Sequence, residues 1–511
     1  MPVLPLPDRS RIDQLRATAK LLRDLVRGGD PGAVEMVREH HPRLGDLAAD
    51  TPGAAGFRLA DAQLTLARHH GFASWPRLKA HVEVVVRLTR SPHRQPVGGE
   101  PTTESERVDE LLRLACLTYG ADDPDRARAA LAMATGTVLS GSSLHAAAAL
   151  GDVTAARRWL ASDPTLAARD GGPFGWVPLL YAAYSRVDDP AAGRDTVGVA
   201  RLLLDQGADP DAGYLWDGLP SPFTALTGAF GGGEGNQPPH ARALELARLL
   251  LAHGADPNDS QTVYNRGLGA IPRDDTAWLA LLLDHGLGTG DGGPWKRLLG
   301  HEAMGPAEVA GEALQHAATS GLVARVRVLL EHGVDPGRPG GHPAFGDRTP
   351  YDAAVRHGHA EIARLLAEAG ADLTTDPTSP FVGAFLAADA AAVERLRTES
   401  PDALDRLRRD APDLVTTAAE LGRPEAVRLL AAHGFDVSHP GRRGPLHEAA
   451  YRGDGATVGA LLEVGADPTV RDPEHDGTPA GWAAHGGHPD LARLLDDAAA
   501  DWAQRSGGRS L

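Results

Sequence analysis

The 511-residue sequence has little cysteine, few aromatic residues and no long apolar run. Its single cysteine, Cys116, excludes an internal disulfide and favours a reducing compartment. Because Cys116 lies in the apolar run LLRLACLTYG, we expect a buried and inert thiol. No run of about 18 apolar residues occurs, and the first residues lack the apolar core of a signal peptide. We therefore expect a cytoplasmic protein that does not enter membranes.

The sequence also lacks the motifs of common enzymes and metal sites. The stretch HEAAY at 447–451 is not a zinc-binding HExxH motif, because Tyr451 replaces the second histidine. GGGEG at 231–235 lacks the lysine and hydroxyl residue of a phosphate-binding loop. Paired histidines occur, but without cysteine or carboxylate companions at metal-ligand spacing. We expect no catalytic residue, no metal and no cofactor.

Charge is distributed unevenly along the chain. The formal net charge is −17 overall, with +5 up to residue 95 and −22 beyond it. An acidic surface repels nucleic acids and anionic membranes, so neither is an expected partner.

A short helix–break–helix unit recurs through most of the chain. In residues 442–468, Pro445 begins a helix, Gly453-Asp454 breaks it, and a second helix carrying Leu461 ends at Gly465. Proline suits a first helical turn and glycine suits a left-handed helix end. Neither helix can bury its apolar face alone, so each unit requires neighbours.

Copies of this unit recur near the period of about 33 residues that is typical of ankyrin repeats. They lie at 143–160, 199–210, 246–257, 313–336, 348–372, 414–436 and 477–495. The sequence from 141 to 497 thus resembles the ankyrin-repeat family. His145 and His447 each follow a leucine, as the histidine of the family's Leu-His pair does. The resemblance implies that this histidine makes a hydrogen bond within the turn.

The expected fold class is all-α: an ankyrin-repeat solenoid preceded by a small helical N-terminal domain. We expect a helical leader at 1–90, a linker at 91–105, a helical connection at 106–140, the repeat array at 141–497 and a C-terminal tail at 498–511. The run FRLADAQLTLARHHGFASWPRLKAHVE resembles a leader that precedes ankyrin arrays in bacterial proteins, which implies a cap without chemistry.

Two repeats in the first half are longer than the period, and their glycine and proline content predicts loops without extra helices. These long loops are expected at 213–240, 258–269 and 286–300. Insertions in a solenoid fall on one face, which is often the binding face.

The long loops concentrate aromatic and polar residues in a chain poor in aromatics. The candidate binding residues are Tyr181, Tyr214, Trp216, Phe223, Glu234, Tyr264, Asn265 and Trp295. Three uses of the aromatic side chains are consistent with the sequence. They could pack as a local core, bind a protein partner, or line a small-molecule or catalytic pocket.

The resemblance implies a monomeric interaction scaffold or adaptor that binds a protein partner on its concave surface and is not an enzyme. Asp217, Glu234 and Asp291 would suit a basic segment of that partner. The alternative is a small-molecule or catalytic pocket formed by the loops of 213–300. Convergence of Trp216, Tyr264 and Trp295 on one pocket would favour this alternative.

Overall fold

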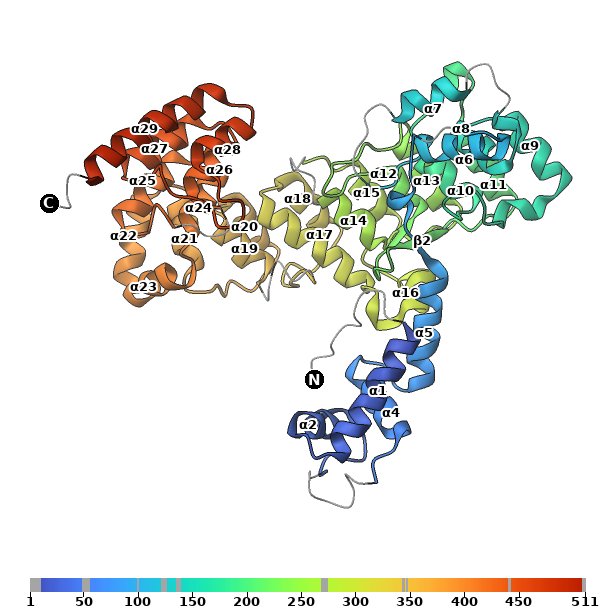
Figure 1. Cartoon of the computed structure of the whole chain (residues 1–511), viewed down its shortest axis with the longest axis horizontal. Coiled ribbons are helices and arrows are strands. Elements are labelled where there is room, and N and C mark those ends of the chain that lie inside the picture. Colours follow the sequence, from blue (N-terminus) through green and yellow to red (C-terminus); the bar gives the residue numbers. More distant parts are fainter. Residues whose placement is uncertain are drawn as a thin grey trace. The chain divides into compact units, whose positions relative to one another are not determined.

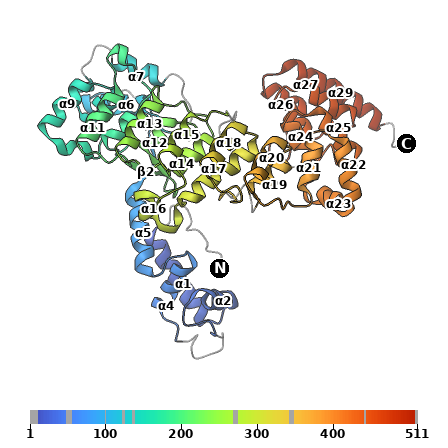
Figure 2. The ribbon, with the colours of Figure 1, turned by 180° about the vertical axis from the view of Figure 1, so that it is seen from behind.

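The computed structural model describes residues 11–47, 56–98, 101–120, 126–134, 139–267, 274–341, 345, 348–439 and 443–507. Figures 1 and 2 show these residues as helices joined by short connections. The chain forms two compact units. The first contains the described residues up to 313 with 331–334 and 340–341, and the second contains 314–330, 335–339 and the described residues from 345 onward.

The leader is helical, as the sequence predicts. Its helices are α1 (Ile12–Arg27), α2 (Pro31–His40), α4 (Leu59–His69) and α5 (Trp75–Leu88). On α1, Leu15, Ala19, Leu22 and Val26 are buried at helical spacing. The carboxylate of Asp30 accepts the Ala33 N–H and caps α2.

The predicted linker at 91–105 is in part ordered structure. It follows strand β1 (Thr89–Arg90), contains the 3₁₀ turn η1 (Pro92–Arg94) and ends in α6 (Glu104–Ala115), which begins before the predicted boundary. Thr103 caps α6 by accepting the Glu106 N–H, while Glu106 accepts the Thr103 N–H. Helix α7 (Arg126–Ala134) and the 3₁₀ turn η2 (Leu139–Gly141) complete the predicted helical connection.

Helix pairs then repeat through the first unit. The first helices of the pairs are α8 (Leu144–Leu150), α10 (Pro178–Tyr184), α12 (Ala225–Phe230) and α14 (Ser260–Gly267). The second helices are α9 (Val153–Ser162), α11 (Thr196–Asp205), α13 (Ala243–Ala252) and α15 (Ala277–Asp284). Each row packs in series, first helix against first helix and second against second.

The break within a pair depends on glycine. Gly151 ends α8 at a φ of +69°, and a Cβ there would lie 2.4 Å from the Asp195 backbone nitrogen. The next residue, Asp152, caps α9 by accepting the Ala155 N–H. The histidine expected to bond within the turn does so, because His145 Nε2 lies 2.9 Å from the Arg169 carbonyl oxygen.

The prediction that the three long segments lack helices is wrong. Residues 213–240 contain strands β2 (Gly213–Trp216) and β3 (Pro222–Thr224) as well as α12, residues 258–267 contain α14, and residues 286–300 contain α16 (Gly293–Leu299). Residues 268–269 lie outside the described part. The helices are short and their sequences are rich in turn residues, so tertiary packing outweighs the local propensity.

Strands β1, β2 and β3 form a small sheet in that order. β1 runs parallel to β2 with Arg90 opposite Trp216, and β2 runs antiparallel to β3 with Tyr214 opposite Phe223. Leu215, on the other face of β2, packs with Leu299, Val85 and Leu88. The leader is thereby docked on the first repeats, through a sheet that the sequence did not predict.

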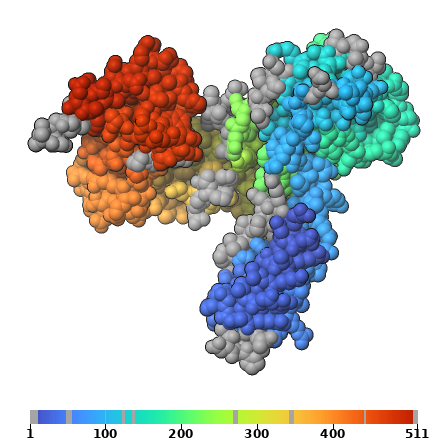
Figure 3. Space-filling model, in the orientation of Figure 1, coloured from blue at the N-terminus to red at the C-terminus, as the bar shows by residue number. Residues whose placement is uncertain are grey.

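Further helices follow in pairs, beginning with α17 (Pro306–Ser320) and α18 (Val323–Glu331). In the second unit they are α19 (Pro350–Arg356), α20 (Ala360–Glu368), α21 (Ser379–Leu386), α22 (Ala390–Glu399), α23 (Pro401–Asp410), α24 (Leu414–Glu420), α25 (Pro424–Ala432), α26 (Pro445–Tyr451), α27 (Gly455–Glu463), α28 (Pro479–His485) and α29 (Pro489–Gly507). In Figure 3 the orange and red residues of this unit form one continuous body.

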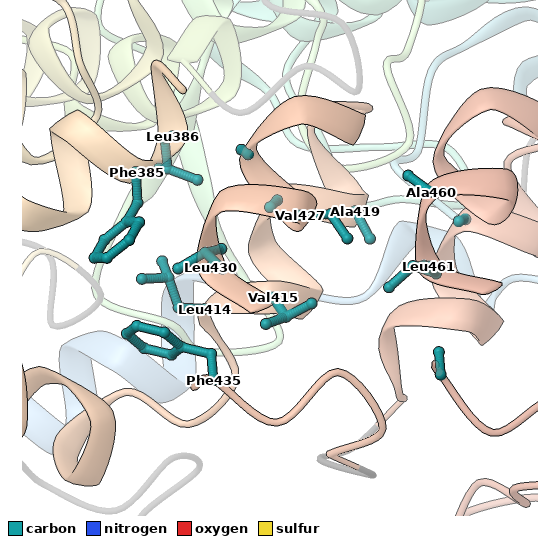
Figure 4. Packing of buried hydrophobic residues seen from close by; sticks show 14 of the residues in the cluster. Phe385, Leu386, Leu414, Val415, Ala419, Val427, Leu430, Phe435, Ala460 and Leu461 are labelled. Atoms are coloured by element: carbon teal, nitrogen blue, oxygen red, sulfur yellow. The ribbon is translucent and has the colours of Figure 1, made fainter. Parts of the chain in front are cut away.

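One apolar cluster runs through the second unit from α21 to α29. Figure 4 shows the two rings of Phe385 and Phe435 beside Leu414 and Leu430, with ring centroids 5.3 Å apart at 73°. Helix α29 continues to Gly507, so the predicted tail at 498–511 is helical over its described part.

Substituting Leu461 by aspartate tests the register of the repeats. Leu461 lies on α27 with no exposed surface, so Leu461→Asp buries an unpaired charge and should lower the free energy of unfolding by about 3 kcal/mol or more. The control is Leu494→Asp on α29, where the side chain is 49% exposed and the expected change is within about 0.5 kcal/mol. Equal denaturation midpoints for the two variants, measured by circular dichroism, would contradict the register.

The cysteine should react only in the unfolded protein. Cys116 is buried, its thiol lies 3.7 Å from the Tyr181 carbonyl oxygen, and burial raises its pKa to about 12. We expect no reaction of the native chain with a chromogenic disulfide reagent, and one equivalent after denaturation in guanidinium. Native labelling at the rate of a free thiol would show that the site opens.

Candidate functional site

The first unit contains an open cavity of about 740 Å³. The wall combines aromatic rings, amides and carboxylates: Tyr119, Trp216, Phe223, Tyr264, Gln237, Gln261, Asn265, Glu234 and Glu312. The remaining lining residues are Gly120, Leu219, Pro220, Ser221, Gly233, Gly235, Ser260, Met304 and Gly341. Five of the eight predicted binding residues meet here, namely Trp216, Phe223, Glu234, Tyr264 and Asn265.

The small sheet positions the first aromatic wall. Tyr214 and Trp216 share one face of β2, and Phe223 stands opposite Tyr214 on β3. The Trp216 ring stacks on His93, with centroids 4.2 Å apart and planes at 28°, and lies 6.1 Å from the Phe223 ring. Trp216 is half-buried, and its indole N–H donates to the Thr118 carbonyl oxygen at 3.4 Å.

Asp217 fixes the end of that wall. It has a φ of +53° and follows directly on β2. Its carboxylate accepts hydrogen bonds from the Ser91 hydroxyl and, at 2.7 Å, from Arg94. The charge of Asp217 is therefore compensated, and Asp291 is likewise paired with Arg297 at 2.7 Å. Both carboxylates that the sequence predicts to suit a basic partner are thus ion-paired with arginines of this chain.

A glycine-rich turn after α12 carries Glu234 to the cavity. Gly232 and Gln237 exchange backbone hydrogen bonds, and the Gly233 N–H donates to the Asn265 carbonyl oxygen at 2.8 Å. A Cβ on Gly232 would lie 2.5 Å from that same oxygen, so glycine is required by the close approach to α14. The turn places Glu234 next to Tyr264, whose hydroxyl donates to Glu234 Oε1 at 3.2 Å.

A buried carboxylate sets the position of α14. Asp259 accepts the Thr262 N–H at 2.8 Å and caps this helix. It also accepts hydrogen bonds from the hydroxyls of Thr224 and Thr227, which lie at the start of α12. Burial raises the pKa of Asp259 although these hydrogen bonds oppose the shift.

Amide groups line the base of the cavity. Asn265 is 3% exposed, and its Oδ1 accepts from Gln261 Nε2 at 2.8 Å. Its Nδ2 has no hydrogen-bond partner among the described residues. Gln237 Nε2 donates to the Gly120 carbonyl oxygen at 3.3 Å. Buried donors in folded proteins are normally paired, and the Asn265 side chain also acts on the Tyr119 hydroxyl, where its hydrogen bond opposes the rise in pKa that burial causes.

Three predicted binding residues lie elsewhere. Tyr181 is fully buried and its hydroxyl donates to the Gly171 carbonyl oxygen at 2.9 Å. Tyr214 is 2% exposed and packs against Trp176 with centroids 5.1 Å apart. These rings form the local aromatic core that was one of the three uses considered, so the prediction that they are accessible for binding is wrong.

Trp295 lines a second cavity of about 340 Å³, together with Tyr214, Arg87 and Arg90. Its indole N–H donates to the Asp211 carbonyl oxygen at 2.9 Å. The convergence that would favour a small-molecule pocket is therefore partial, because Trp216 and Tyr264 share the larger cavity while Trp295 does not.

Several wall residues were not predicted from the sequence. Gln261 stands four residues before the predicted Asn265 on α14, a spacing that would have placed both on one face if the helix had been predicted. Tyr119 precedes a glycine and has a φ of +56°, which no sequence pattern announces. Met304 and Glu312 reach the cavity only through the path of the chain around α16 and α17.

Within the described ranges, no group of three or more histidine, cysteine, aspartate or glutamate residues could hold a metal ion. Of the helices that the structure describes, none has the length and apolar character to cross a membrane.

Comparison with known protein families matches two stretches of the chain. A model of three ankyrin repeats matches residues 295–376, and a single-repeat model matches residues 443–473. No curated protein matches the sequence. Ankyrin repeats generally act as protein-interaction modules. These matches show ankyrin repeats at residues 295–376 and 443–473, and the helix pairs described above follow the same helix–break–helix pattern.

Proposed function

We propose that this chain is an interaction scaffold that holds a segment of a protein partner in the cavity of its first unit. The observation that carries the proposal is the wall itself, in which Trp216, Phe223 and Tyr264 lie beside the amides of Gln261 and Asn265. Aromatic side chains anchor binding segments because they bury a large area at little conformational cost.

The polar groups suit a polypeptide. The hydroxyls of Ser221 and Ser260 and the amide of Gln261 stand in the same wall and can exchange hydrogen bonds with a main chain. We propose that the protein acts as a monomer.

The proposed setting follows from composition. The net charge of −17 disfavours nucleic acids and anionic membranes as partners. The single cysteine, held as a buried thiol, suits the reducing cytoplasm. A non-enzymatic role agrees with the ankyrin repeats.

A small-molecule site is the second candidate function. The observation that favours it is the volume of about 740 Å³, which lies inside the range of about 300–1,000 Å³ typical of ligand pockets. A ligand of that size would use the same wall.

Tyr264 is the sharper probe of this site. Trp216 supports His93 and Thr118, so Trp216→Ala should destabilise the protein as well as alter the cavity. Peptides selected from a random displayed library on the intact chain should lose affinity about tenfold or more in Tyr264→Ala, since anchor residues are worth about 1–2 kcal/mol. The melting temperature should stay close to that of the wild type.

The matched control is Tyr451→Ala on α26, a tyrosine that is 40% exposed in the second unit. Selected peptides should bind this variant as they bind the wild type. If Tyr451→Ala abolishes binding while Tyr264→Ala does not, the partner site lies in the second unit. If Tyr264→Ala unfolds the chain, the ring is structural.

A further inference from the structure

The charged side chains in the described wall of the cavity are all acidic. Glu234 stands on the turn after α12, and Glu312 on α17. Glu234 is exposed and accepts a hydrogen bond from the Tyr264 hydroxyl at 3.2 Å. Burial, together with the nearby charges of Glu234 and Glu312, raises the pKa of Tyr264, so both carboxylates act on the same ring.

Two arginines that neighbour wall residues or their contacts are committed to other carboxylates. Arg266 follows Asn265 on α14, but its guanidinium lies 2.5 Å from Asp275 and 5.8 Å from the centre of the Trp278 ring. Arg94, beside Trp216, pairs with Asp217 at 2.7 Å. Within the part of the chain that the structure describes, Glu234 takes part in no ion pair.

We infer that the cavity selects an organic cation, namely the lysine or arginine side chain of a partner segment. Its charged end meets Glu234 and the Tyr264 hydroxyl, and its methylene groups pack against Trp216 and Phe223. The inference rests on the proposed function, because the partner segment carries the cation.

Physical chemistry favours this occupant over the alternatives. A hydrogen bond between an ammonium or guanidinium group and a carboxylate is about twice as strong as one between neutral groups. The faces of aromatic rings attract cations and disfavour anions. A neutral side chain would fill the apolar part of the wall and leave Glu234 to water.

A small probe tests the charge preference directly. n-Butylammonium has the stem and charge of a lysine side chain, and 1-pentanol is its neutral counterpart of similar size. Titrated into the full chain at low ionic strength, where screening is weak, butylammonium should bind saturably with a Kd on the order of millimolar. Pentanol should bind about tenfold more weakly or not at all. Equal affinities for the two probes, or no saturable binding of butylammonium, would overturn the inference.

Two matched variants test whether the Glu234 carboxylate causes the preference for butylammonium. Glu234→Gln should remove the preference for butylammonium, whereas Glu245→Gln, an exposed residue of α13 outside the cavity wall, should retain it. Unchanged circular dichroism melts exclude a folding effect. A Glu234→Gln chain that still prefers the cation tenfold would show that another group is responsible.

Peptides separate this inference from the proposed function. Replacing the lysine or arginine of a selected peptide by norleucine should weaken its binding to the wild type, and should matter little in Glu234→Gln. If the norleucine peptide binds equally well and still requires Tyr264, the partner site stands and the cation preference is wrong. If butylammonium binds but no peptide requires Tyr264, the proposed function fails and the cation is a free amine.

Discussion

The buried hydrogen bonds of Asp259 hold the candidate site in place. One carboxylate ties together the start of α14, through the Thr262 N–H, and the start of α12, through the hydroxyls of Thr224 and Thr227. Thr224 in turn caps α12 and is the last residue of β3. A neutral replacement without acceptors would leave several buried donors unpaired and release both helices.

The segment directly after the leader supports the site. His93 stacks on Trp216, while Ser91 and Arg94 hold Asp217 at the end of β2. The orientation of the Trp216 ring is therefore fixed by residues of the segment that the sequence predicts to be a polar linker. The other face of β2, through Leu215, packs on α5 and α16. One short strand thus joins the leader, the cavity wall and the core.

The repeats could be read from sequence because their signals are local. Pro445, Gly453 and Asp454 each act within one turn of their own helix. The sheet and the helices of the long segments could not be predicted from the sequence, because the residues that stabilise them are far away along the chain. Trp216 and Tyr264 are both aromatic residues of long segments, and the sequence does not distinguish them. In the structure Trp216 stacks on His93, whereas the Tyr264 hydroxyl donates to Glu234. Tyr181 and Tyr214 differ from them only in burial, which depends on the path of the whole chain.

The pairing of β1 with β2 changes how the first unit can fold. In a simple solenoid each repeat contacts only its neighbours, so folding can begin anywhere and spread along the array. Here Ser91 and Asp217 are 126 positions apart in sequence, and their contact must close a long loop. Loop closure carries an entropic cost that local repeats avoid, and non-local pairing slows folding. We therefore expect β1 to pair late in folding, so that the cavity wall is completed only after the repeats between β1 and β2 have formed.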